Sequence, residues 1–379
     1  MSADLEPGAL DLGPLVDHHC HGLVREDLDR PAFESMMNEA DGPSPLGTTL
    51  FDSMLGLAIR RWCAPVLDLD PHADPDDYLA RRRELGAAEV NRRFVAATGI
   101  STFLVDTGLT PDAITSRDEL AGLAGDARAT SHEIVRLEAV AADVLAAGVP
   151  AGGFAEEVRQ RLRDSGAVGA KSIAAYRVGL SLPERQPTGD ELVAALSDVR
   201  PGAGGGYRIA QPVVNGWLAW TAVELGMPLQ FHVAYGDNDV DLAACDPLRL
   251  TAFLRATQDR GAPVLLLHNY PFHRNAAYLA QVFSHVFMDV GLAVHNTGAL
   301  SLTLLRETLE LVPFGKLLFS SDAYGLAELY HLATLLFRRG LDEVLGGLAA
   351  AGELSSADVD RIGRLVGSEN ARRAYALPG

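Results

Sequence analysis

The chain has 379 residues, of which 48% are hydrophobic, and this is enough apolar material for a large buried core. Its formal net charge of −18 argues against nucleic acid or an anionic membrane as the main partner. The 3 cysteines are odd in number and widely spaced, which argues against a disulfide framework and suits a reducing cytosol.

The amino-terminal segment from Met1 to Glu6 is acidic and lacks the basic and apolar regions of a secretory signal. No run of about 18 uncharged apolar residues occurs, so we expect no membrane-spanning helix. Together with the cysteine usage, this predicts a cytoplasmic protein.

Short apolar strands alternate with helical stretches along the chain, which is the pattern of a parallel sheet. The strands are expected at residues 14–20, 100–106, 133–138, 167–173, 228–233, 263–268, 285–290 and 317–322. Eight such strands predict an α/β fold, a closed (β/α)8 TIM barrel, in which catalytic groups gather at the C-terminal strand ends. An open doubly wound sheet is the alternative, but it would bring the ends of distant strands together less easily.

The stretch from 22 to 98 is too long for a simple loop. Its apolar side chains recur at helical spacing, at Phe51, Leu55, Ile59 and Trp62. We therefore expect residues 1–379 to form a single barrel domain, with residues 22–98 as a helical cap inserted after the first strand.

Candidate metal ligands lie at the ends of several strands. Asp17, His19 and His21 alternate along the first strand, so they share one face, and two imidazoles two residues apart can hold one ion. His232 and Asp322 end later strands and would complete a shell of three histidines and one carboxylate. Such ligands suit Zn²⁺, with Mn²⁺ or Fe²⁺ as alternatives. Two satisfied core histidines are the competing interpretation of His19 and His21.

This ligand set predicts a metal-dependent enzyme, because a catalytic ion lowers the pKa of bound water toward 7. Asp322 is the candidate to accept the water proton and pass it to a leaving group. His268, at the end of the sixth strand, is the candidate to polarise the substrate carbonyl or to hold the nucleophile. A second metal ligand and a structural histidine are the alternatives for His268.

Substrate-binding candidates cluster around the fourth strand. Lys171 lies within that strand, where an unpartnered lysine is costly to bury. It is either carboxylated and bridges two ions, or pairs as a cation with substrate or a carboxylate, or packs inside the barrel. Tyr176 and Arg177 follow the strand, and the planar fork of arginine fits a carboxylate. A surface or helix-capping arginine is the alternative for Arg177.

These residues resemble the amidohydrolase superfamily, in the branch called amidohydrolase 2. The resemblance is carried by Asp17, His19 and His21 as Asp-x-His-x-His, by the strand histidines His232 and His268, by the pair Ser321-Asp322, and by the ending from Asn370 to Tyr375. The run from Lys171 to Leu180 is similar to that of nodulin-like proteins, in which such domains are fused to a glutamine synthetase-like domain.

The resemblance implies a metal-dependent hydrolase that cleaves a C–N amide bond of a small molecule, such as a γ-glutamyl compound. The superfamily also contains decarboxylases, so a metal-dependent decarboxylase of a small carboxylic acid is the alternative. A non-catalytic scaffold is a third hypothesis, against which the complete ligand set argues. Barrels of this branch are often dimers, so the resemblance implies a homodimer as one assembly.

Overall fold

The computed structural model describes residues 10, 12–40, 42, 46–109, 112–202 and 204–378, so the segment interpreted above as lacking a secretory signal lies outside the described residues. Two compact units are present. Unit 1 comprises Met1–Val105, Thr110–Ser131 and Val290–Arg373, and unit 2 comprises Asp106–Leu109, His132–Asp289 and Ala374–Gly379. Whether the chain is one domain, as expected from the sequence, stays a prediction.

In unit 1 the first strand is buried along its whole length. β1 (Leu15–Cys20) pairs in parallel with β2 (Ile100–Asp106). The helices between these strands are α1 (Arg30–Ser35), α2 (Met54–Ala58), α3 (Pro75–Leu85) and α4 (Ala87–Ala96), joined by shorter 3-10 and π turns. Helical structure after the first strand therefore follows the expectation from the apolar spacing.

The eighth predicted strand, at 317–322, runs beside β1 without forming a regular strand. The amide of His18 donates to the carbonyl of Phe319 at 3.2 Å, and the amide of Asp322 donates to the carbonyl of His19 at 3.0 Å. Asp322 has a φ of 49°, which departs from the extended backbone that a regular strand requires. The segment therefore lies beside β1, where a strand was expected, but the prediction that it forms a regular strand is wrong.

A buried ion pair joins the inserted helices to α14 (Ala327–Ala350) within unit 1. Glu328 is 0% exposed and accepts hydrogen bonds from Arg82 Nε at 2.8 Å and from the Tyr78 hydroxyl at 2.9 Å. The guanidinium of Arg82 also lies over the ring of Phe33, 5.2 Å from its centroid. Burial lowers and Glu328 raises the pKa of Arg82, with a net rise, so the guanidinium of Arg82 stays charged.

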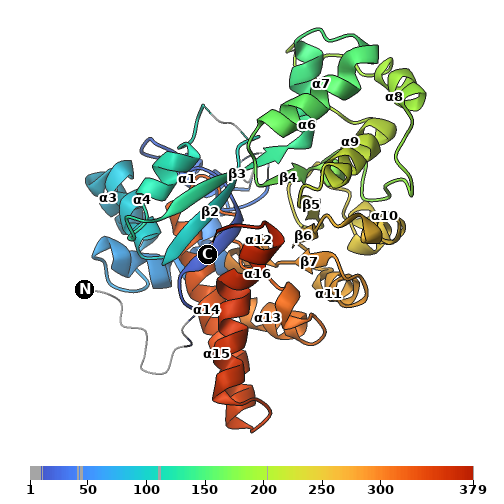
Figure 1. Ribbon diagram of the computed structural model, residues 1–379. Helices are drawn as coiled ribbons and strands as arrows, with labels where there is room; N and C mark the ends of the chain where they lie inside the picture. Colours follow the sequence, from blue (N-terminus) through green and yellow to red (C-terminus); the bar gives the residue numbers. More distant parts are fainter. Residues whose placement is uncertain are drawn as a thin grey trace. The chain divides into compact units, whose positions relative to one another are not determined.

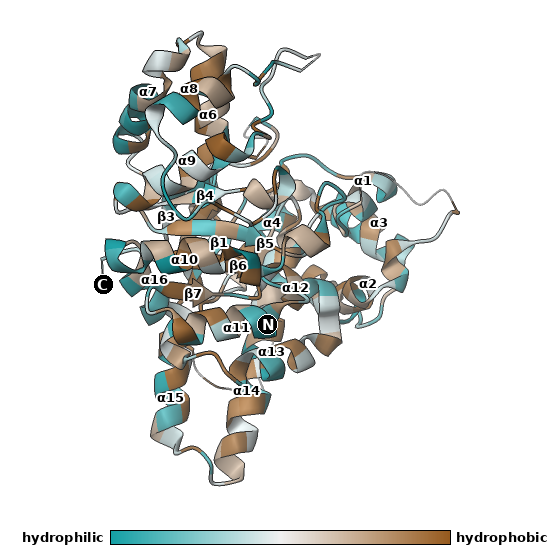
Figure 2. Ribbon diagram, turned by 90° about the vertical axis from the view of Figure 1, so that its right-hand side faces the viewer, coloured by the Kyte–Doolittle hydropathy of each residue, from teal (hydrophilic) through white to brown (hydrophobic). Residues whose placement is uncertain are grey.

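The remaining helices of unit 1 are α5 (Arg117–Gly122), α12 (Gly291–Thr297), α13 (Ser301–Leu309), α15 (Ser356–Arg364) and α16 (Asn370–Ala374). In Figures 1 and 2, α14 and α15 lie side by side. Asn370, at the start of α16, donates to the carbonyls of Phe314 and Leu317. This side chain therefore fixes the start of the segment that carries Asp322.

Unit 2 contains most of the sheet. β3 (Thr130–Arg136), which begins in unit 1, pairs in parallel with β4 (Gly169–Ser172), which is followed in order by β5 (Leu229–Val233), β6 (Val264–His268) and β7 (Val286–Met288). The helices of this unit are α6 (Leu137–Ala146), α7 (Ala151–Asp164), α8 (Gly189–Leu196), α9 (Pro212–Glu224), α10 (Thr251–Thr257) and α11 (His273–Val282). Figure 2 colours β6 as hydrophobic, in keeping with a strand that is buried throughout.

The strands follow one another in the sheet in chain order, from β1 to β7, with helices between them. A doubly wound sheet reverses its strand order, so this order excludes it. The chain has the α/β fold of a (β/α)8 barrel with helices inserted after the first strand, as the sequence predicted. Among the described residues, no helix combines the length and the apolar character needed to cross a bilayer.

One half-buried histidine of unit 1 predicts acid sensitivity. His331, in α14, packs against the ring of Phe94, and burial lowers its pKa from 6.5 to about 4. Below about pH 6.5 the unfolded chain therefore takes up a proton at His331 that the folded protein excludes. The contribution of His331 to the free energy of unfolding is fully present above about pH 6.5 and is lost as the pH falls to 4. Because His331 is half-buried as a residue, we expect a loss of about 2 kcal/mol rather than the full ~3.4 kcal/mol.

The variant His331→Gln removes this titration and is expected to lose about 2 kcal/mol less stability than the parent between pH 7 and pH 4. Guanidinium unfolding at both pH values measures the difference. The exposed His72 provides the control, since His72→Gln is expected to keep the parent's pH dependence. Equal acid sensitivity of His331→Gln and the parent would contradict the prediction.

Candidate metal centre

Two histidines of β1 converge on one carboxylate within unit 1. His19 Nε2 lies 3.1 Å and His21 Nε2 lies 3.4 Å from the same oxygen, Asp322 Oδ1. The two imidazole rings are 5.1 Å apart and almost perpendicular, at 86°. All three side chains are largely buried, with exposed fractions of 1%, 7% and 11%. Alternation along the strand therefore places His19 and His21 on the same side, as expected, and Asp322 meets them there.

Asp17, the first residue of the Asp-x-His-x-His pattern, holds the segment before Asp322. Its two carboxylate oxygens accept hydrogen bonds from the Ser321 amide at 2.9 Å and the Ser321 hydroxyl at 2.6 Å. Burial raises the pKa of Asp17 to about 7, although the bonds from Ser321 oppose that rise. The contact explains why the chain carries a serine directly before Asp322.

His295, in α12, adds a third imidazole to the surroundings of Asp322. It is 1% exposed, and within the described residues its Nδ1 is buried without a hydrogen-bond partner. Burial lowers the pKa of His295 to about 4, against the opposing charge of Asp322. This imidazole is therefore neutral at physiological pH.

In unit 2 a second group of predicted residues gathers at the ends of β5 and β6. The rings of His232 and His268 are 4.5 Å apart, and the ring of Tyr176 lies 4.3 Å from that of His232. The Tyr176 hydroxyl is 3.3 Å from His232 Nδ1. Gly236 passes so close that a Cβ atom there would overlap the Tyr176 hydroxyl and crowd His232 Nε2. Both strand-end histidines thus lie in one packed cluster with a predicted substrate-binding tyrosine.

A carboxylate that the sequence interpretation left out holds His268 in place. Asp289 follows β7, and its Oδ1 accepts the amide of His268 at 2.8 Å, while its carbonyl accepts Asn269 Nδ2 at 2.9 Å. His268 and Asn269 have φ values of 68° and 61°, a conformation that residues other than glycine adopt at a cost. Asp289 lies at the end of a predicted strand, so the rule that found His232 could also have found it.

The other two substrate-binding candidates differ in exposure. Lys171 is 2% exposed and lies between Arg136 and Gln230 in the sheet register. The Arg177 side chain is 19% exposed and donates from Nη1 to the carbonyl of Tyr176 at 3.2 Å. Arg177 is therefore placed just beyond β4, and Lys171 within it, as the sequence predicted.

Glu138, at the start of α6, is a second buried carboxylate that sequence reasoning missed. It accepts hydrogen bonds from the Ser172 hydroxyl at 2.8 Å and from the Ile173 amide at 3.0 Å. Burial raises the pKa of Glu138, while these bonds oppose the rise. No sequence motif indicates Glu138, because its hydrogen-bond partners lie at and just beyond the end of the next strand, β4.

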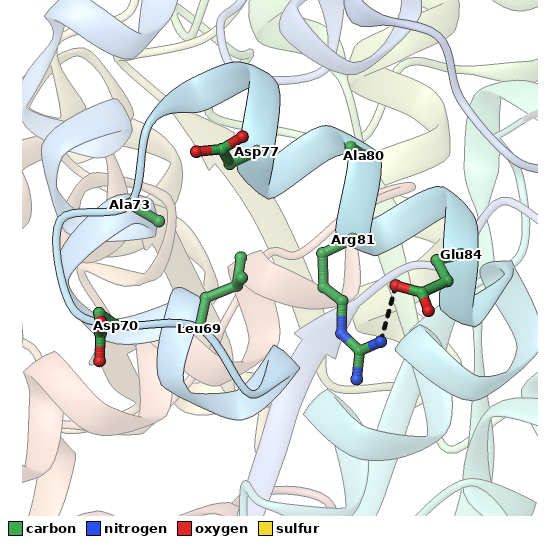
Figure 3. Close-up of a pocket in the computed structure, with 7 residues that line it drawn as sticks. All are labelled: Leu69, Asp70, Ala73, Asp77, Ala80, Arg81 and Glu84. Carbon is green, nitrogen blue, oxygen red and sulfur yellow. Dashed lines mark hydrogen bonds and ion pairs between the residues drawn. The ribbon is translucent and has the colours of Figure 1, made fainter.

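A surface hollow in unit 1 lies beside α3 and contains none of the predicted ligands (Figure 3). Its arginine, Arg81, is paired with Glu84 and Asp68, each at 2.8 Å. The acidic side chains that line the hollow are Asp70, Asp77 and Glu84. The hollow therefore offers no free cation for an anionic substrate among the residues that line it.

Solved structures resemble this chain along nearly its whole length. A candidate metal-dependent hydrolase from Lactobacillus casei ATCC 334 matches with a TM-score of 0.79 at 30% sequence identity, over 97% of this chain and 96% of that one. A uronate isomerase from Bacillus halodurans C-125 matches with a TM-score of 0.60 at 15% identity, over 97% and 94% of the two chains, and shares the fold alone.

Among curated proteins, the protein fluG of Emericella nidulans is 26% identical over 96% of this chain. The chain spans 46% of the length of that relative. No protein-family profile matches the chain. The amidohydrolase 2 branch and the nodulin type stay predictions. The 30% identity over nearly the full length of both chains shows that this chain belongs to the same family as the candidate metal-dependent hydrolase from Lactobacillus casei and is an enzyme.

Proposed function

We propose that the chain is a metal-dependent hydrolase that cleaves the C–N bond of a small amide, with γ-glutamyl amides as the first substrates to test. The convergence of His19 Nε2 and His21 Nε2 on Asp322 Oδ1 is the observation that carries this proposal. The description of the Lactobacillus relative as a metal-dependent hydrolase supports it.

The donor chemistry of these residues fits a divalent cation. Two imidazole nitrogens and one carboxylate oxygen are ligands that Zn²⁺ accepts, and Mn²⁺ or Fe²⁺ accept the same set. His19, His21 and Asp322 would hold the ion. That His232 is the fourth ligand stays a prediction from the sequence. When bound, the ion lowers the pKa of water toward neutrality, which makes hydroxide available for attack on a carbonyl.

Asp322 is the proton carrier in this proposal. It accepts the proton of the attacking water, a C–O bond forms at the carbonyl carbon, and the C–N bond breaks as Asp322 delivers the proton to the leaving nitrogen. Asp17 supports this role, because its two bonds to Ser321 hold the residue directly before Asp322. That His268 donates a hydrogen bond to the carbonyl oxygen, as negative charge develops on it, stays a prediction from the sequence.

Tyr176, Arg177 and Lys171 are the proposed substrate-binding residues, and a small molecule is the proposed partner. Cys20, Cys63 and Cys245 are all buried and form no disulfide among the described residues, which supports a cytoplasmic enzyme with reduced thiols. A homodimer is the assembly that the family resemblance suggests.

Chelation tests the proposed metal dependence. Removal of metal with a chelator is expected to lower the hydrolysis of a γ-glutamyl amide by at least about 10³-fold, and Zn²⁺ or Mn²⁺ should restore it. Turnover in H₂¹⁸O should place one ¹⁸O atom in the carboxylate product. Elemental analysis gives the number of ions per chain in the parent and in His232→Ala, and lower occupancy in this variant is the expected result.

Two results would contradict the proposal or part of it. Release of carbon dioxide without incorporation of ¹⁸O would favour the decarboxylase hypothesis instead. Full activity after complete metal removal would eliminate the metal-dependent mechanism. A fall from two ions to one in Lys171→Ala would identify a carboxylated, bridging lysine, whereas an unchanged count would favour a cationic Lys171.

A further inference from the structure

Two arginines of unit 2 meet at a single backbone oxygen. Arg177 Nη1 lies 3.2 Å and Arg208 Nη2 lies 3.1 Å from the carbonyl oxygen of Tyr176, and both donate to it. Because both groups reach the same atom, the two guanidinium ions are close neighbours. Like charges at such short range repel one another, and an anion placed between them offsets that repulsion.

The nearest anion satisfies this pair only partly. Asp239 Oδ2 lies 3.0 Å from Arg208 Nη2 but 3.7 Å from Arg177 Nη1, so one carboxylate oxygen serves two cations. The Asp239 side chain is 48% exposed, whereas that of Arg177 is 19% exposed. Burial and the charge of Arg208 lower the pKa of Arg177. The more buried cation therefore has the poorer partner.

The other charges that act on Arg177 are already engaged. Glu138 is bound by the Ser172 hydroxyl and the Ile173 amide. Arg136 donates to Asp106 Oδ2 from Nη2 at 2.6 Å, and this pair is largely buried. Glu138 and Arg136 thus act on Arg177 with opposite signs, and an excess of positive charge remains at the two guanidinium groups.

The pair adjoins the cluster around His232. Tyr176 supplies the shared carbonyl oxygen on one side, and its hydroxyl is 3.3 Å from His232 Nδ1. The loop that carries Asp239 begins beside the same tyrosine, since Gly236 packs against the Tyr176 hydroxyl and His232 Nε2. A ligand group held by the two arginines would therefore lie next to a proposed catalytic histidine cluster.

We infer that Arg177 and Arg208 form a carboxylate-binding subsite, and that Asp239 occupies this subsite until a substrate carboxylate displaces it. This inference rests on the proposed function for the identity of the ligand as the substrate. Arginine forks bind carboxylates through paired hydrogen bonds, and one carboxylate oxygen already lies where the ligand would bind. Asp239 is half-exposed, so it returns to water at little cost when it is displaced.

Calorimetric titration of the full chain tests the subsite without turnover. The protein is first treated with chelator and then titrated with glutarate, its neutral diamide glutaramide, and inorganic phosphate. We expect glutarate to bind at least about tenfold more tightly than either comparator. Arg208→Gln should weaken glutarate binding by about tenfold, whereas Asp239→Asn should tighten it several-fold because it removes the competing carboxylate.

Arg200 provides the matched control, because it is an exposed arginine on the chain segment that leads to Arg208 and, among the residues that the structure describes, it donates to the carbonyl of Val199 alone. Arg200→Gln should leave glutarate binding unchanged. Equal effects of Arg208→Gln and Arg200→Gln would overturn the subsite, and so would weaker binding to Asp239→Asn. Tighter binding of phosphate than of glutarate would overturn the carboxylate assignment.

The two proposals fail in different ways. If the protein did not hydrolyse amides in a metal-dependent way, the expected binding of glutarate to the metal-free protein would be unaffected. Conversely, a protein that hydrolyses amides with metal but binds glutarate equally well in Arg208→Gln would retain the proposed function and lose this subsite.

Discussion

Replacing Asp322 by asparagine is expected to lower kcat by about 10³-fold or more while leaving the folded structure intact. Asparagine has almost the same volume, but it neither carries negative charge nor accepts a proton. The change therefore removes the group on which His19 and His21 converge at 3.1 and 3.4 Å. Steady-state kinetics measure the loss, and elemental analysis should show reduced metal occupancy.

A surface carboxylate supplies the control for this experiment. Asp143 is exposed on α6, and Asp143→Asn should retain parent activity and metal content. His19→Ala should give a loss similar to that of Asp322→Asn, since both remove a proposed ligand. Asp322→Asn and His19→Ala variants that keep normal turnover would show that the metal centre has been assigned to the wrong residues.

The largest expected loss of stability follows from Glu328→Gln. The change leaves the charge of Arg82, which is 4% exposed, without its carboxylate partner. Breaking a buried ion pair from one side costs about 3 to 5 kcal/mol, because the remaining charge stays desolvated. Guanidinium unfolding followed by circular dichroism should show this decrease in the free energy of unfolding.

The same helix, α3, offers a matched surface pair. Arg81 and Glu84 form an ion pair in Figure 3, with the Glu84 side chain 69% exposed. Glu84→Gln should leave the free energy of unfolding within experimental error of the parent, because solvent screens exposed pairs. The double variant Arg82→Met, Glu328→Leu should recover most of the stability lost in Glu328→Gln. Equal stability of Glu328→Gln and Glu84→Gln would contradict a structural role for the buried pair.

The sequence was sufficient to predict the strand order, because buried parallel strands leave short apolar runs between helical segments. β2 (Ile100–Asp106) coincides with the predicted range, whereas β7 (Val286–Met288) is shorter than predicted. The segment at 317–322 was expected to be a regular strand, but hydropathy does not report backbone torsions. Asp322 leaves the extended region there, and its contacts with His19 and His21 are made from that conformation.

Polar contacts between distant segments were harder to foresee. The bonds from Ser321 to Asp17 join residues far apart in the chain, and neither residue type alone indicates its partner. Glu138 escaped notice for a similar reason, since it binds the backbone amide of Ile173, just beyond the end of β4. Alternation and strand position locate a side chain on a face, whereas the hydrogen-bond partner depends on the register of neighbouring strands.

The close packing of Gly236 limits how the specificity of this enzyme could be redesigned. Any larger residue at this position would push the Tyr176 hydroxyl out of place before it reached a new ligand. A mutant library aimed at altered selectivity should therefore hold position 236 constant. Substitutions of Arg208, which donates to the carbonyl of Tyr176, would alter the charge at the arginine pair without requiring the backbone to move.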